Sequence, residues 1–121
     1  MSEGNTRVLI ADDDPLVRMI MVDTLGDAGF DILEATNGIE ACRLLDDPDN
    51  IDLVVTDLNM PGSDGIEVAK CARTHHPKVP VLFVSGRPDL LTSLPFPYRY
   101  LAKPFTLQTL AATVRELLHR V

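Results

Sequence analysis

Six polar side chains of this sequence stand at or just after the end of a short apolar run. They are Asp12, Asp13, Asp14, Asp57, Ser85 and Lys103. A short apolar run bounded by turn residues is typical of a strand buried on both faces of a sheet. Parallel strands bring their carboxyl ends to one edge of the sheet, where α/β proteins bind their ligands. The spacing therefore predicts one site that contains carboxylates, a hydroxyl group and an ammonium group.

Such a site suits phosphoryl transfer that depends on a metal ion. Carboxylates held close together repel one another, and protonation or a bound cation relieves the repulsion. Mg²⁺ is suitable because it takes one or two carboxylates together with water and phosphate oxygens. An aspartate can attack phosphorus to give an aspartyl-phosphate, and positive charge then stabilises the phosphoryl oxygens. We expect Asp57 to be this nucleophile, Lys103 to pair with it, and the Ser85 hydroxyl to contact the phosphate.

Alternating strands and helices are expected to position these side chains. The apolar runs predict strands at 7–11, 31–35, 53–57, 79–84 and 99–102. Apolar residues at three- and four-residue steps predict helices at about 15–28, 39–45, 65–75 and 107–121. The expected N-caps are Asp14, Ser63 or Asp64, and Thr106. The alternation predicts a doubly wound, five-stranded parallel sheet in the flavodoxin-like order 2-1-3-4-5.

The stretch from Gly86 to Tyr98 breaks this regularity. Pro95 and Pro97 prevent a helix from continuing past about Leu94, because proline lacks an N–H and restricts the residue before it. At most residues 88–94 can be helical. We therefore expect a shortened or irregular fourth helix between the last two strands.

The composition narrows the possible functions. The chain has 121 residues and a formal charge of −7, which argues against direct nucleic-acid binding. It contains no apolar run of 18 residues and no signal peptide, so we expect a cytoplasmic protein without a membrane span. We expect one domain over residues 1–121 and no effector domain. Cys42 and Cys71 lack CxxC spacing and are interpreted as separate reduced thiols.

Several of the polar residues also have simple structural explanations. Asp14 precedes Pro15 and is interpreted as an N-cap only, so we exclude it from the metal site. His75 and His76 stand at a predicted helix end and are interpreted as surface residues favoured by the helix dipole. A lone lysine or serine is usually solvated or part of a turn. The joint placement of these residues at the ends of four predicted strands favours the functional interpretation.

The motifs around these residues resemble the receiver domain of response regulators in two-component signalling. They are Ile10-Ala11-Asp12-Asp13-Asp14-Pro15, Thr56-Asp57-Leu58-Asn59-Met60-Pro61-Gly62 with Asp64-Gly65, Val84-Ser85-Gly86 and Tyr100-Leu101-Ala102-Lys103-Pro104-Phe105. By this resemblance, Asp57 is the phosphoacceptor and one ligand of Mg²⁺. Asp13 would bind the ion directly and Asp12 largely through water, and the Asn59 backbone carbonyl would be a further ligand.

The resemblance also implies the remaining roles. Lys103 and Ser85 would contact the phosphoryl group, and Tyr100 would be the aromatic switch. The donor would be a phosphohistidine on a histidine kinase or a histidine phosphotransfer protein, and the downstream protein target is unknown. Such a domain catalyses only its own phosphorylation and dephosphorylation. It occurs as a stand-alone protein or attached to a hybrid kinase.

Two other classes of function stay open. A phosphohydrolase of the haloacid-dehalogenase type also forms an aspartyl-phosphate, but it needs a second aspartate two residues after the nucleophile. Asn59 occupies that position here. A receiver fold used only as a docking surface would not need Asp57, Asp13 and Lys103. Mass spectrometry after treatment with a small-molecule phosphodonor and Mg²⁺ would separate the three classes.

Overall fold

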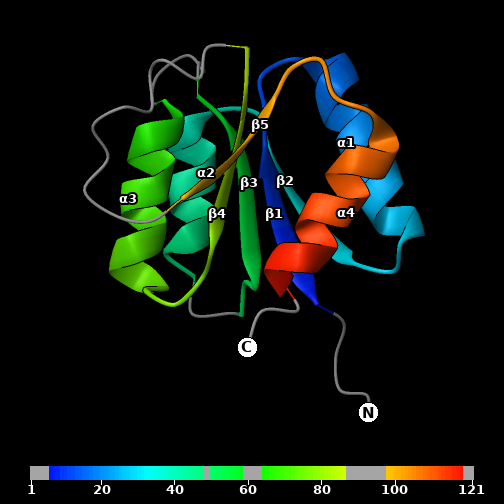
Figure 1. Cartoon of the computed structure of the whole chain (residues 1–121). Coiled ribbons are helices and arrows are strands. Elements are labelled where there is room, and N and C mark those ends of the chain that lie inside the picture. The colour runs from blue at the N-terminus through cyan, green and yellow to red at the C-terminus, as the bar shows by residue number, and fades with distance from the viewer. Residues whose placement is uncertain (1–5, 48–49, 59–63, 87–97, 119–121) are drawn as a thin grey trace.

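The computed structural model describes residues 6–47, 50–58, 64–86 and 98–118. In these ranges the chain forms five parallel strands in the order β2-β1-β3-β4-β5, with four helices (Figure 1). The elements are β1 (Arg7–Ala11), α1 (Pro15–Asp27), β2 (Asp31–Ala35), α2 (Gly38–Leu45), β3 (Leu53–Asp57), α3 (Gly65–His75), β4 (Val81–Ser85), β5 (Arg99–Ala102) and α4 (Leu107–Leu118). This is the flavodoxin-like sheet predicted from the sequence.

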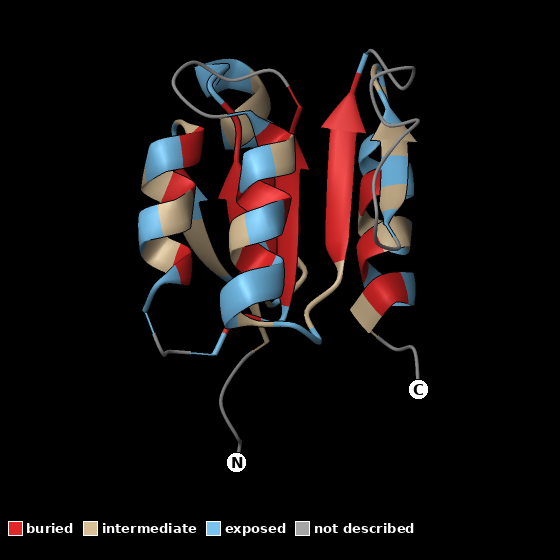
Figure 2. Ribbon diagram, turned by 90° about the vertical axis from the view of Figure 1, so that its left-hand side faces the viewer, coloured by how far each residue is buried: buried red, intermediate tan, exposed pale blue. Residues whose placement is uncertain are grey.

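Helices cover both faces of the sheet. Helices α1 and α4 lie on one face, and α2 and α3 lie on the other (Figure 1). Every residue of β3 and β4 is buried, whereas the outer strands β2 and β5 are partly exposed (Figure 2). The central strands thus form a rigid base for the residues at their carboxyl ends.

Alternate residues of the central strands divide the core into two halves. Leu9, Val54 and Phe83 pack with apolar residues of α2 and α3. Their neighbours on the same strands, including Val8 and Val55, pack with α1 and α4 instead. This separation follows from the two-residue period of a strand, whose side chains point to opposite faces.

The helix starts follow the capping residues in the sequence. The Asp14 carboxylate accepts hydrogen bonds from the Leu16 and Val17 amides at 2.9 and 3.3 Å, and Pro15 occupies the first turn of α1. Asp64, one of the two residues proposed for this role, caps α3. The Thr106 hydroxyl accepts from the Thr109 amide at 3.0 Å. Three predicted caps are thereby confirmed.

Some details of the prediction were wrong. Strand β4 begins at Val81 rather than at residue 79. The reason is that Pro80 has no amide hydrogen with which to join the hydrogen bonds of the sheet. Ile20 and Leu107, which the three- and four-residue spacing assigns to the apolar faces of α1 and α4, are instead 38% and 51% exposed, and Ile39 in the first turn of α2 is 53% exposed. Their apolar stripes are wider than the strip of each helix that the sheet covers. The predicted irregular helix between β4 and β5 falls on residues 87–97, which lie outside the described residues.

The interpretation of the cysteines as separate thiols was also wrong. Cys42 of α2 and Cys71 of α3 form a disulfide, with their Cα atoms 5.6 Å apart. The two helices lie side by side on one face of the sheet, and this packing aligns the cysteines. The separation of the two cysteines along the chain, 29 residues, gives no indication of the bond.

In the described ranges, no helix combines the length and the apolar character needed to cross a membrane.

Candidate functional site

The register of the sheet brings the predicted polar residues to one edge. Ala11 pairs with Thr56, so Asp12 and Asp57 follow at the same level on β1 and β3. Asp57 pairs with Val84, the residue before Ser85. Ser85 pairs with Ala102, the residue before Lys103. Four neighbouring strands therefore present their carboxyl ends at one place.

Three carboxylates meet at this edge. Oxygen atoms of Asp12, Asp13 and Asp57 all lie within 4.8 Å of one another. Asp12 is fully buried and Asp57 is 8% exposed, whereas Asp13 is exposed. Two of the carboxyl groups are thus held within the protein, and the third is at the solvent boundary. Oxygen ligands in this arrangement are what a hard divalent cation such as Mg²⁺ requires.

Lys103 supplies positive charge to this cluster. Its Nζ donates to Asp57 Oδ2 at 3.2 Å and to Asp12 Oδ2 at 3.3 Å. The Lys103 backbone amide donates to the Ser85 carbonyl at 2.9 Å, which fixes the base of the side chain against β4. The Lys103–Pro104 peptide bond is cis. One lysine therefore bridges the two buried carboxylates from the far side of β4.

The electrostatic environment shifts the pKa of two groups. Burial raises the pKa of Asp12, although the hydrogen bond from the Asp14 amide and the charge of Lys103 act against this. Burial by itself would lower the pKa of Lys103, but the charges of Asp12 and Asp57 outweigh it and the pKa is raised. Lys103 is therefore a cation at neutral pH. Asp12 is a carboxylate whose ionised form is costly to keep buried.

Contacts around Asp12 hold the loop after β1 in place. The Asp12 carboxylate accepts from the Asp14 amide at 2.9 Å. Arg18 Nη1 donates to the Asp12 backbone carbonyl at 2.8 Å, and Arg18 also pairs with Glu34 at 3.3 Å. Arg18 was not among the predicted site residues. Its position just after the start of a predicted helix was the available signal, because helical side chains lean toward the N-terminus.

The backbone after Asp57 is tightly packed against the start of α3. The Gly65 amide donates to the Leu58 carbonyl at 2.9 Å. A Cβ atom at Gly65 would overlap the backbone carbonyl oxygen of Asp57. The Thr56 hydroxyl donates to this same oxygen at 3.0 Å. Only glycine lets α3 begin so close to the end of β3. The start of α3 is therefore in direct contact with the backbone of Asp57.

The other predicted residues have different surroundings. Ser85 is 1% exposed at the end of β4, next to Lys103 in the register of the sheet. Tyr100 lies on β5 with 43% of its surface exposed, and it pairs with Phe83 in the register. Asn59, the predicted fourth metal ligand, lies outside the described residues. The structure thus brings together Asp12, Asp13, Asp57 and Lys103, with Ser85 beside them.

The two histidines lie at the C-terminal end of α3, where the sequence predicted them, but only His75 is exposed and His76 is half-buried. His75 Nε2 is 2.7 Å from Asp46 Oδ1, and both side chains are exposed. His76 Nε2 lies 2.9 Å from the Leu45 carbonyl oxygen. Both contacts join the C-terminal ends of α2 and α3, which gives the histidines a structural explanation.

Known proteins of similar sequence share this fold. The family model for the response regulator receiver domain matches residues 8–115. The chain is 34% identical over 97% of its length to the sensor kinase CckA of Brucella abortus, of which it covers 13%. It is 33% identical over 93% of its length to the chemotaxis protein CheY homolog of Campylobacter jejuni, of which it covers 92%. The chain belongs to the receiver-domain family and is a phosphoacceptor domain of two-component signalling.

Solved structures agree with this assignment. A response regulator receiver protein from Sinorhizobium medicae superimposes with a TM-score of 0.86 at 32% identity, covering 97% of both chains. The response regulator TrrA of Thermotoga maritima, solved in complex with Mg²⁺ and BeF, has a TM-score of 0.82 at 30% identity. The match covers 93% of this chain and 99% of TrrA.

Proposed function

We propose that residues 1–121 act as one domain in which Asp57 accepts a phosphoryl group from a phosphohistidine. The donor is a histidine kinase or a histidine phosphotransfer protein. The observation that carries the proposal is the bridge from Lys103 to Asp57 and Asp12 within a cluster of three carboxylates. An acceptor needs a carboxylate at a rigid position and positive charge beside it. Asp57 has both.

Mg²⁺ is the proposed cofactor. Asp12, Asp13 and Asp57 would hold it, with the Asn59 backbone carbonyl as a further ligand. The bound ion would supply positive charge that neutralises the carboxylates and the phosphoryl oxygens. The donor atoms are all hard oxygens, which fits this ion. The Mg²⁺ complex of TrrA supports the proposal from a related protein.

The residues of the chain have distinct roles in the transfer. An Asp57 carboxylate oxygen attacks phosphorus, the bond from phosphorus to the donor imidazole nitrogen breaks, and the imidazole leaves with the electron pair. Lys103 then pairs with a phosphoryl oxygen instead of the free carboxylate. The Ser85 hydroxyl donates to another phosphoryl oxygen. Tyr100 serves as the switch that reports these contacts on the exposed face of β5.

The protein would act in the cytoplasm. Its phosphorylation would change the surface that a partner protein binds, and it would catalyse only its own phosphorylation and dephosphorylation. The downstream target is a protein rather than DNA, since the chain carries a formal charge of −7.

The proposal is tested by incubating the protein with acetyl phosphate and Mg²⁺ and measuring its intact mass. We expect one phosphoryl group per chain, and none when Mg²⁺ is chelated. The Asp57→Asn variant should lose the label. Asp14→Asn is the matched control, because Asp14 only caps α1 and its substitution should leave labelling intact. Continued labelling of Asp57→Asn, or release of phosphate without a labelled protein, would contradict the proposal.

A further inference from the structure

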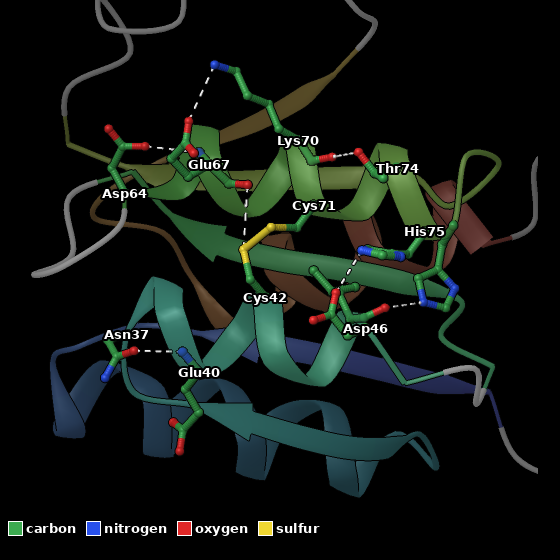
Figure 3. The surroundings of a disulfide bond; sticks show 12 residues. Asn37, Glu40, Cys42, Asp46, Asp64, Glu67, Lys70, Cys71, Thr74 and His75 are labelled. Carbon is green, nitrogen blue, oxygen red and sulfur yellow. Dashed lines mark hydrogen bonds and ion pairs between the residues drawn. A yellow bond between two sulfur atoms is a disulfide. The ribbon is translucent and has the colours of Figure 1, made fainter.

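The disulfide joins α2 and α3, the two helices that cover one face of the sheet. Cys42 and Cys71 are the only cysteines of the chain, and the loop that their bond closes contains all of β3. In Figure 3 the disulfide lies near the middle of the helix pair. Asp64 and Glu67 are at one end of the pair, and Asp46 and His75 are at the other. Asp64 is the N-cap of α3 and follows the segment after Asp57.

The packing of α2 on α3 does not depend on the bond. Ala41 and Leu45 of α2 lie in the same buried cluster as Val68, Ala69 and Ala72 of α3. The histidine contacts at the C-terminal ends hold the pair together there. Reduction should therefore leave the two helices folded and paired. The effect of reduction is expected toward the start of α3, where Cys42 Sγ contacts the Glu67 carbonyl oxygen and Gly65 meets the backbone of Asp57.

Both cysteines are accessible to small reagents. Each is only partly buried, and Cys42 Sγ lies 3.7 Å from the Glu67 carbonyl oxygen in an exposed contact. Exposed disulfides are the labile ones, whereas buried structural disulfides resist reduction. The proposed phosphohistidine donor also implies a reducing compartment, where disulfides are usually transient or redox-sensing. The bond is thus placed where it can open and close.

We propose that Cys42 and Cys71 form a reversible thiol–disulfide modification site that sets how strongly the acidic cluster binds its cation. The inference rests on the proposed function, because it concerns regulation of the same site. A peroxide takes two electrons and two protons from the two thiols and is reduced to water as the S–S bond forms. A dithiol reverses the step: its thiolate attacks one sulfur, its second thiol resolves the mixed disulfide, and the reductant leaves oxidised.

The start of α3 carries the effect to the site. Helix α3 meets the backbone of Asp57 and Leu58 at Gly65, with no space left for a side chain. The repelling carboxylates favour a wider arrangement when no cation is bound. The disulfide opposes this widening because it ties α3 to α2. The oxidised protein keeps the carboxylates close, and the reduced protein must first contract to bind.

Calorimetric titration of the oxidised and reduced protein with Mg²⁺ tests the inference. We expect the oxidised form to bind Mg²⁺ with an affinity roughly threefold higher or more. If only a fraction of the reduced molecules has the carboxylates close enough to bind the ion, the apparent affinity falls by that fraction. Alkylation followed by mass spectrometry should count no free thiols after peroxide and two after dithiothreitol. The Cys42→Ser, Cys71→Ser double variant is the control, and it should bind like the reduced form under both treatments.

Two results would overturn the inference. One is that both thiols stay free after peroxide treatment, and the other is that the two forms have equal Mg²⁺ affinity. Labelling by acetyl phosphate in both states separates this inference from the proposed function. Labelling with equal affinities contradicts the redox inference alone. A difference in affinity without labelling of Asp57 contradicts the proposed function alone.

Discussion

At the scale of single residues, the site balances two buried carboxylates against one lysine. Asp12 and Asp57 are held by the ends of β1 and β3, and Lys103 Nζ lies within 3.3 Å of an oxygen of each. Both carboxylates are therefore held largely out of the solvent. The ammonium group occupies the position of a counter-ion and is available to pair with a phosphate.

Replacement of Lys103 should show how much the repulsion between these carboxylates lowers the free energy of unfolding. Lys103→Met removes the charge and leaves the two carboxylates repelling each other, so in the absence of Mg²⁺ we expect a loss of about 1–3 kcal/mol in unfolding free energy. Urea denaturation with and without Mg²⁺ measures it, and added Mg²⁺ should recover part of the loss. Lys70→Met is the control, since its exposed pair with Glu67 is worth only about 0.5 kcal/mol. Equal effects of the two substitutions would contradict the account.

The raised pKa of Asp12 predicts a pH dependence of stability. Its folded-state pKa lies above the unfolded value of 3.8, because burial disfavours the charge. The folded state therefore holds this proton more strongly, and the contribution to stability falls as pH rises from the unfolded pKa through the folded one. Asp12→Asn cannot titrate and should flatten this part of the profile in Mg²⁺-free buffer. Urea unfolding across the acidic range checks the prediction, and an unchanged profile would contradict it.

At the scale of elements, the site depends on how closely α3 follows β3. The Gly65 amide reaches the Leu58 carbonyl, and the Asp57 carbonyl oxygen occupies the space that a side chain would need. The backbone of Asp57 and Leu58 is thus held by the start of α3 as well as by the sheet. A change in the position of α3 must move the backbone of Asp57.

Substitution of Gly65 tests this contact. Gly65→Ala should destabilise the protein by about 1–3 kcal/mol, because the methyl group forces backbone atoms apart. It should also weaken Mg²⁺ binding, since the shift falls at Asp57. Gly26→Ala in α1 is the matched control: nothing lies within 4 Å of the added carbon, and alanine favours a helix by about 0.5–1 kcal/mol. A Gly65→Ala variant as stable as the wild type would contradict the packing argument.

The same elements show which features a sequence can predict. Strand order, helix starts and the residues at the strand ends depend on local patterns: Asp14 before Pro15 marks a helix start, and the apolar run that leads into Asp57 marks a strand. The Cys42–Cys71 bond depends on the position of α2 against α3, which no local pattern encodes. The exposure of Ile20 has a similar cause. It lines an apolar cavity of about 430 Å³ with Val17, Phe105 and Leu107, between α1 and the start of α4.

The site itself was partly predictable for the same reason. Parallel strands necessarily gather Asp12, Asp57 and Lys103 at one edge, so their meeting followed from the strand assignment. The bridging of both carboxylates by one lysine did not follow, because it depends on the path of a long side chain across β4. The support from Arg18 depends in the same way on the tilt of α1 over the loop.

At the scale of the whole molecule, cation binding should couple to folding. The acidic cluster forms only when β1 and β3 are paired, so Mg²⁺ binds the native state better than the unfolded chain and raises the melting temperature by mass action. Asp13→Asn removes one ligand and should weaken this rise, while stabilising the metal-free protein by removing a repelling charge. Thermal unfolding across a Mg²⁺ series measures both effects. The same Mg²⁺ response in variant and wild type would contradict the assignment of Asp13.

The central claim is that Asp57 carries the phosphoryl group, and chemical trapping tests it most directly. An aspartyl-phosphate is an acid anhydride, so borohydride reduces it to homoserine at the phosphorylated residue. Protein treated with acetyl phosphate and Mg²⁺ is reduced, digested and sequenced by mass spectrometry. The account predicts homoserine at position 57 and at no other aspartate. Homoserine at position 12 or 13, or none at all after labelling, would contradict it.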